Sequence, residues 1–178
     1  MIITGVSHKP ERLFERSSLP SNELVYLASK ALKSYKATRL ITSLEPGWEQ
    51  ALAKAAIELK IPYVIALPYP GRNSEWSREA RVAYYELLSR AEEVYQINDS
   101  CSETALFECH TWQVDRADVV LALWDYEFEG DTFAVIDYAL QQDVEVGNLW
   151  QDWSSLYKLR KQNTRNMVES SRKGAQVF

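Results

Sequence analysis

The chain has 178 residues, of which 46% are hydrophobic, and its formal net charge is −5. This length and composition are typical of one globular domain with a proper core, which excludes a disordered chain, and the negative charge argues against nucleic acid as the main partner. The apolar runs are too short to span a bilayer, and the first residues lack the features of a signal peptide, so we expect a cytoplasmic protein with no membrane partner.

The apolar pattern predicts strands that alternate with helices. The predicted strands cover residues 2–6, 39–43, 62–67, 94–97, 117–124 and 144–149. The predicted helices cover residues 21–33, 46–59, 77–90, 101–116 and 132–142. Such alternation implies an α/β fold, a Rossmann-like three-layer sandwich around a mainly parallel sheet. We expect the segments that contain Ile2, Leu40, Val64 and Val119 to be adjacent or near-adjacent strands.

Charge divides the chain into two parts. From Ser154 onward six basic residues accompany one acid, Glu169, so this tail carries +5 and the remainder −10. We therefore expect a Rossmann-like domain over residues 1–150 and a basic tail or helix over residues 151–178. Three interpretations of the tail are open: it binds an acidic partner, it lies on the chain's own acidic core, or it is solvated.

The cysteines and histidines are few. Cys101 and Cys109 are too few for a disulfide framework, and with only His8 and His110 beside them we expect no metal and no cofactor. Cys109 and His110 as nucleophile and base are an alternative, but sequence neighbours rarely face each other. We interpret Cys109 as a small apolar residue.

The candidate site lies in the loops that follow the strands, because ligands of parallel α/β folds bind beyond the carboxyl ends of the strands. These loops are residues 5–10, 43–49, 68–76, 98–102 and 125–132. The candidate ligand-binding residues are His8, Ser43, Gly47, Glu49, Arg72, Trp76, Asp125, Gly130, Asp131 and Thr132.

Several of these residues have two interpretations. Trp76 stacks on a planar ring of a ligand or belongs to the core. Arg72 meets a phosphate or makes a surface ion pair. His8 titrates near neutral pH or orders its loop by a hydrogen bond. Gly130 and Thr132 suit an anion at a helix N-terminus, where Asp131 competes for the same donors or serves as the N-cap.

Three motifs resemble those of the YpsA-like family in the SLOG superfamily, which also contains the DprA-like and LOG proteins. Residues 61–71, followed by Trp76, resemble the family's third-strand signature. Residues 114–118 and 121–125 resemble its second signature, and residues 8–10 resemble its first-strand motif. The resemblance covers residues 2 to about 149. It implies a Rossmann-type fold that binds nucleotides or nucleotide-derived small molecules.

The chain departs from the family pattern at the glycine-rich turns. Ser43 stands where a glycine is expected, Trp48 and Glu49 replace the end of a Gly-Val-Asp turn, and Asp131 replaces the second glycine of Gly-Gly-Thr. Glycines let a phosphate approach the backbone closely, whereas these residues add bulk and negative charge. We therefore expect weakly charged, nucleoside-like ligands to bind better than nucleoside triphosphates. The LOG motif Pro-Gly-Gly-x-Gly-Thr is absent, so phosphoribohydrolase activity is not implied.

Three functions compete. The first is a small-molecule binding protein with a sensor or sequestering role. The second is an enzyme that acts on a nucleotide or an N-glycosidic bond, with Glu49 or Asp125 as acid or base. The third is a degenerate domain for protein–protein contact, with Trp48, Trp150 and Trp153 as anchors. Binding is favoured because no nucleophile–base pair is evident, and catalytic residues stay unassigned. The acidic core and aromatic helices suggest a homo-oligomer, as is common in the superfamily.

Overall fold

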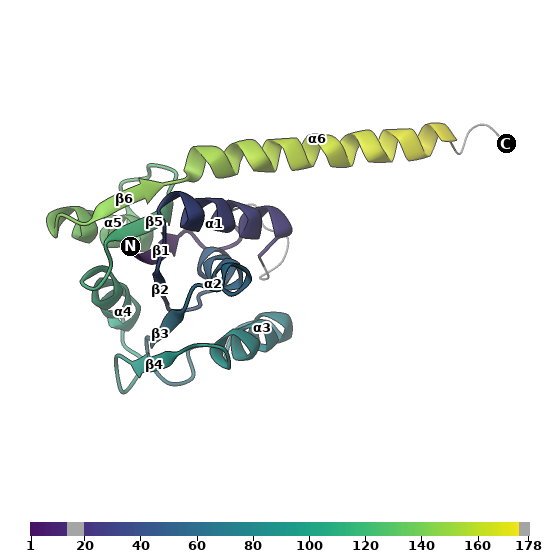
Figure 1. Ribbon diagram of the computed structural model, residues 1–178. Coiled ribbons are helices and arrows are strands. Elements are labelled where there is room, and N and C mark those ends of the chain that lie inside the picture. The colour runs from purple at the N-terminus through teal and green to yellow at the C-terminus, as the bar shows by residue number, and fades with distance from the viewer. Residues whose placement is uncertain (14–19, 175–178) are drawn as a thin grey trace.

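Strands and helices alternate along the chain, as the apolar pattern predicts (Figure 1). The computed structural model describes residues 1–13 and 20–174, with side chains up to residue 166. The strands in these ranges are β1 (Ile2–Ser7), β2 (Arg39–Thr42), β3 (Tyr63–Leu67), β4 (Glu93–Gln96), β5 (Val119–Leu123) and β6 (Glu145–Asn148). The helices there are α1 (Asn22–Ser34), α2 (Trp48–Leu59), α3 (Arg78–Leu88), α4 (Ala105–Val114), α5 (Gly130–Gln141) and α6 (Trp150–Gly174).

The strands form one sheet in the order β4-β3-β2-β1-β5-β6, and every neighbouring pair is parallel. Ile3 of β1 lies opposite both Leu40 of β2 and Val119 of β5. The predicted parallel sheet and the predicted neighbours are therefore confirmed. The chain moves outward from β1 to β4 and then returns through α4 to β5 on the other side of β1. The winding thus reverses between β1 and β5, which is where such sheets bind ligands.

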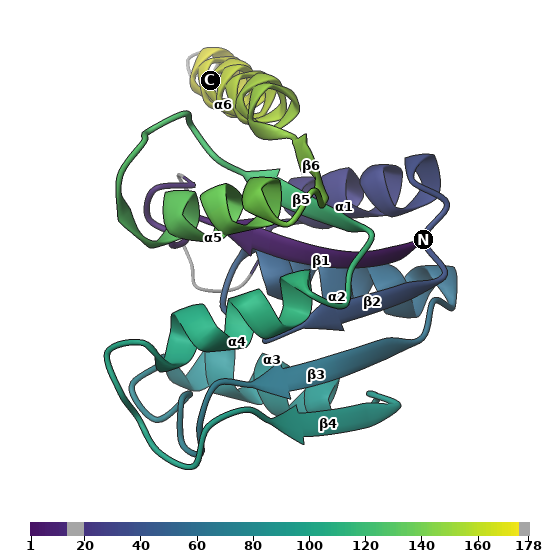
Figure 2. The ribbon, with the colours of Figure 1, turned by 90° about the vertical axis from the view of Figure 1, so that its left-hand side faces the viewer.

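Helices cover both faces of the sheet. Helices α1, α2 and α3 lie on one face, and α4 and α5 lie on the other (Figure 2). Strand β5 contributes to both cores, with Leu121 and Leu123 in the larger cluster and Val120 and Ala122 in the smaller one. Successive strand side chains point to opposite faces, so a strand covered on both sides is apolar at every position.

Helix α2 approaches β1 closely at Gly5, where a Cβ atom would collide with the Leu52 side chain. The same helix begins with Trp48, which is fully buried and donates its indole N–H to the Leu121 carbonyl at 2.8 Å. These contacts fix the first turn of α2, including Glu49, beside the carboxyl ends of the central strands.

Helix α6 starts against the body and then extends away from it (Figure 1). Trp153 is fully buried and donates its indole N–H to the Leu13 carbonyl at 3.1 Å. The expectation that Trp48 and Trp153 anchor a protein partner is therefore wrong, because neither side chain reaches the surface. Residues 175–178 of the predicted tail lie outside the described residues, as do the side chains of Glu169, Arg172 and Lys173.

Helix α4 begins later than predicted, at Ala105 instead of Cys101. The residues before it are polar and include Ser102 and Thr104, whose side chains favour turns and helix caps over helix interiors. The Thr104 hydroxyl donates to the Glu108 carboxylate at 2.7 Å and so holds the first turn.

Candidate functional site

A cleft of about 790 Å³ lies at the carboxyl ends of the strands, next to the point where the winding reverses. Its walls come from the loops after β1, β2, β3 and β5 and from one face of α4. The polar, charged and aromatic residues that line it are Ser7, His8, Lys9, Glu11, Arg12, Glu45, Glu49, Arg72, Glu75, Trp76, Ser77, His110, Glu129, Asp131 and Thr132. No lining residue comes from the described loop after β4, residues 98–102, which we had also expected at the site.

The cleft brings together seven of the ten candidate residues, namely His8, Glu49, Arg72, Trp76, Gly130, Asp131 and Thr132. The other three do not line it. Ser43 is buried and donates its hydroxyl to Glu49. Gly47 precedes α2 and lies next to Pro10. Asp125 is paired with His8 and Arg12. Their assignment to a ligand site remains a prediction.

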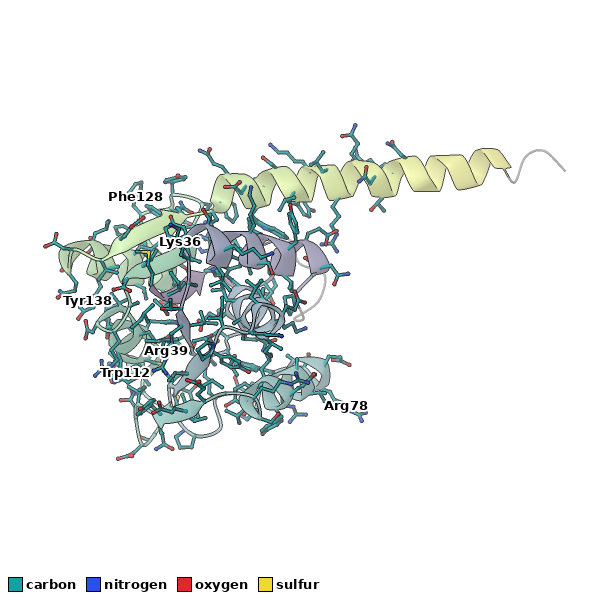
Figure 3. The ribbon with its side chains drawn as sticks, in the orientation of Figure 1. Lys36, Arg39, Arg78, Trp112, Phe128 and Tyr138 are labelled. Carbon is teal, nitrogen blue, oxygen red and sulfur yellow. The ribbon has the colours of Figure 1, made fainter. Side chains whose placement is uncertain are left out.

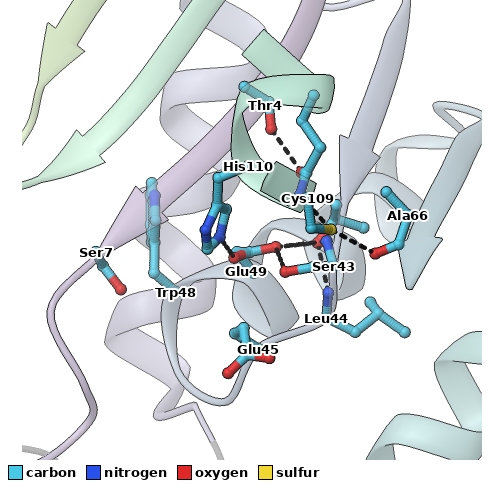
Figure 4. Close-up of polar contacts among 12 residues, drawn as sticks. Thr4, Ser7, Ser43, Leu44, Glu45, Trp48, Glu49, Ala66, Cys109 and His110 are labelled. Atoms are coloured by element: carbon cyan, nitrogen blue, oxygen red, sulfur yellow. Dashed lines mark hydrogen bonds and ion pairs between the residues drawn. The ribbon is translucent and has the colours of Figure 1, made fainter. Parts of the chain in front are cut away.

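Glu49 is the centre of a buried polar network (Figure 4). Its Oε2 accepts from the Thr42 hydroxyl at 3.0 Å, the Ser43 backbone N–H at 2.6 Å and the Ser43 hydroxyl at 2.8 Å. Its Oε1 lies 3.0 Å from Nε2 of His110, which comes from α4 on the other face of the sheet. Burial alone would lower the pKa of His110, but the hydrogen bond and charge of Glu49 outweigh burial and raise it.

A second pair, between Glu45 and Arg72, lies on the same side of the cleft. The Nε and Nη2 atoms of Arg72 each donate to a carboxylate oxygen of Glu45 at 2.8 Å. Burial raises the pKa of Glu45, although Arg72 opposes that shift. The guanidinium also lies 5.8 Å from the ring centroid of Trp76, which packs edge-on against Tyr84. Glu45 thus engages two of the five N–H donors of Arg72, so a phosphate would share the guanidinium with that carboxylate.

A third group of charges ties the loop after β1 to the loop after β5. His8 Nε2 lies 2.9 Å from Asp125 Oδ1, and Arg12 donates to Asp125 Oδ2 through Nη2 at 2.7 Å. Arg12 also pairs with Glu127. Together these contacts clamp the two loops at one end of the cleft, so His8 makes the loop-ordering bond that was one of its two interpretations.

The N-terminus of α5 opens onto the cleft without a side-chain cap. Glu129 is its N-cap residue but makes no capping hydrogen bond, and Gly130 follows with a φ of +83°. Asp131 lies inside the first turn, so the interpretation of Asp131 as N-cap is wrong. Thr132 is only 6% exposed and lines the cleft, and its hydroxyl has no partner among the described residues. The loop before α5 carries Phe128, a largely exposed aromatic side chain (Figure 3).

His110 is one of several lining residues that the candidate residues omitted. It was considered only with Cys109, whose Sγ is instead buried and bonded to the Ala66 carbonyl at 3.2 Å. Burial raises the pKa of the Cys109 thiol, which leaves it unreactive. The available signal was the helical spacing of Leu106 and His110, which places both on one face of α4 and on the cleft wall.

The described residues hold no group of three or more His, Cys, Asp or Glu side chains arranged to bind a metal ion. None of the described helices is both long enough and apolar enough to cross a membrane.

The parallel sheet, covered on both faces and with a cleft at its winding reversal, defines a Rossmann-like α/β protein. Residues 22–148 match the profile of the YpsA family, described as the YspA SLOG family, and the chain belongs to that family. None of the curated proteins matches the chain.

Two solved structures with a similar fold are DNA processing proteins A (DprA). The protein from Streptococcus pneumoniae has 11% identity and a TM-score of 0.54, over 90% of this chain and 56% of that one. The protein from Helicobacter pylori, described with its single-stranded DNA binding mode, has 8% identity and a TM-score of 0.57, over 82% of this chain and 63% of that one. This chain therefore spans less than two thirds of either, and the likeness concerns the fold.

Proposed function

We propose that this protein binds a nucleoside-like or nucleotide-derived small molecule in the cleft, in a sensor or sequestering role. The observation that carries the proposal is the uncapped N-terminus of α5, with the unpaired Thr132 hydroxyl, at the winding reversal of the sheet. The backbone N–H groups of a helix N-terminus are donors for ligand oxygens, and this is the usual ligand position of parallel α/β sheets. Membership of a SLOG family supports the same ligand class.

The charges around the cleft favour a ligand with few negative charges. From the sequence we expected Glu49 and Asp131 to repel a phosphate, but Glu49 is held by His110, as Glu45 is by Arg72. The repulsion arises instead from lining acids without a described partner, which are Glu11, Glu75, Glu129 and Asp131. The helix dipole offsets only about 0.3–1 kcal/mol per charge at an exposed site. We therefore expect nucleosides to bind more tightly than nucleoside triphosphates.

Calorimetric titration of the full chain with adenosine, uridine and ATP tests this proposal. We expect at least one nucleoside to bind and ATP to bind more weakly. Replacing Asp131 with Gly or Asn should strengthen ATP binding, because both changes remove a charge beside the α5 N–H groups. Asp137→Asn is the matched control, since Asp137 lies on the same helix but not on the cleft. Micromolar ATP binding that is insensitive to Arg72→Ala would refute the electrostatic argument.

Single-stranded nucleic acid is the second candidate ligand, because the DprA of H. pylori binds single-stranded DNA and this chain shares its fold. The basic part of α6 also favours it, against our initial expectation from the net charge. Fluorescence anisotropy with a labelled single-stranded oligonucleotide decides between the two ligand classes. Binding that weakens steeply with salt, in a chain that binds no nucleoside, would favour nucleic acid.

A further inference from the structure

One nitrogen of the His110 ring is left for a ligand. Nε2 is bonded to Glu49, whereas Nδ1 has no partner among the described residues. His110 is 9% exposed, and the cleft is the surface that it lines. A molecule that reaches Nδ1 therefore enters through the cleft.

The surroundings of Glu49 decide which ring nitrogen carries the proton. Its Oε2 accepts from three donors, and its Oε1 faces Nε2 of His110 as a hydrogen-bond acceptor (Figure 4). A ring that donates through Nε2 has a bare Nδ1 when neutral and an Nδ1–H when protonated. The charges of Glu49 and Glu45 favour the protonated ring and that of Arg72 opposes it, with a net rise in the pKa. In the protonated ring, the cleft faces a donor, an Nδ1–H.

His8 is paired in the same way but in different surroundings. Its carboxylate partner, Asp125, also accepts two hydrogen bonds from Arg12, through Nε at 3.0 Å and Nη2 at 2.7 Å. The negative charge of Asp125 is therefore shared with a permanent cation, whereas Glu49 has His110 as its sole charged hydrogen-bond partner among the described residues. Hence the two histidines of the chain have separate tasks, with His8 holding loops together.

We propose that His110 is the ligand-selecting donor of the cleft, and that its Nδ1–H binds an acceptor oxygen of the nucleoside-like ligand. The cleft then prefers ligands with a ring oxo group to matched ligands with an amino group, which would place a donor against a donor. Binding also takes up a proton when the ring of the free protein is neutral, so affinity falls as the pH rises. This inference rests on the proposed nucleoside-binding function.

Calorimetry with two matched pairs, uridine against cytidine and inosine against adenosine, tests the inference. We expect the oxo member to bind about ten-fold more tightly at about pH 6, as one hydrogen bond to a charged donor implies. At about pH 8, titrations in two buffers of different ionisation enthalpy should show proton uptake. In His110→Asn the side chain takes up no proton, so uptake should vanish and the preference should shrink.

Each outcome has a separate meaning. Nucleosides that bind without an oxo preference and without proton uptake would overturn the role of His110 and leave the proposed function standing. If no nucleoside binds, the proposed function falls and this inference with it. If His110→Asn fails to fold, pH titration of the histidine ring signals by NMR decides in the native chain, with His8→Asn to assign them. A His110 ring that is already neutral at about pH 6 would overturn the inference.

Discussion

Glu49 serves both the fold and the cleft. It was expected to contact a ligand, yet both of its oxygens are occupied by Thr42, Ser43 and His110. A buried carboxylate is tolerated only when such donors replace its hydration. The sequence-based alternative that Glu49 is a catalytic acid or base stays a prediction, and a substrate at Oε1 would share that oxygen with His110.

Replacing Glu49 with Gln should destabilise the fold. The amide keeps the shape but turns one oxygen into a donor, which then faces another donor. We expect the free energy of unfolding in urea to fall by about 1–3 kcal/mol, the usual cost of a buried unsatisfied polar group. Glu58→Gln, on the exposed side of the same helix, should change it by less than about 0.5 kcal/mol. Equal effects of the two changes would contradict the network.

The protonation of His110 should make stability depend on pH. Because the pKa of His110 is raised in the folded protein, its contribution is complete below the unfolded value of about 6.5 and is lost as the pH rises through the folded value. The native chain should therefore exceed His110→Asn in the free energy of unfolding by more at about pH 6 than at about pH 9. Urea unfolding of both chains at each pH measures this. A constant difference would show that His110 does not change its proton affinity on folding.

At the scale of elements, two helices with similar tryptophans at their starts have different tasks. Trp48 fixes the first turn of α2 over the sheet and so places Glu49. Trp153 fixes the first turns of α6, Leu156 and Arg160 still contact the body, and the helix beyond them extends away from it (Figure 1). The C-terminal part of α6 therefore depends on local helix propensity and on charge, not on a core.

The Trp153 contact should account for most of the stability that α6 contributes. Trp153→Ala removes a fully buried indole and its bond to Leu13, and we expect a loss of about 3–5 kcal/mol in the free energy of unfolding. Leu159→Ala is the matched control on the same helix, since Leu159 is 57% exposed, and it should cost less than about 0.5 kcal/mol. A small effect of Trp153→Ala would mean that α6 is not docked in solution.

At the scale of the whole molecule, charge is separated along the chain. The tail from Ser154 onward carries +5 and the remainder −10, and its described residues belong to α6, which extends away from the acidic body beyond Arg160. Opposite charges on two parts of one chain attract between copies as well as within one.

We therefore retain the prediction of a homo-oligomer. Light scattering at micromolar concentration should give a mass above the 20.5 kDa of one chain at low salt. If α6 meets the acidic body of another copy, raising the salt from about 0.05 M to about 1 M should lower the mass, because such contacts are screened. A monomer at every salt concentration would remove the idea.

The apolar pattern of the sequence was sufficient to predict the architecture. The run of apolar residues around Val119 and the amphipathic helices between the strands predict a covered parallel sheet, because their periods reflect burial directly. The same reasoning located the loops that line most of the cleft, and the family motifs agree with the profile match.

Only the tertiary structure decided which charges face which. Glu49 and His110 are 61 residues apart and meet across the sheet, and Glu45 and Arg72 belong to separate loops. Sequence reasoning counted Glu49 as a free negative charge and passed over His110, because pairing depends on side-chain directions after packing. The burial of Trp48 and Trp153 could not be predicted for the same reason. The sequence does not show whether a tryptophan packs in a core or binds a partner, because only the packing of the folded chain decides this.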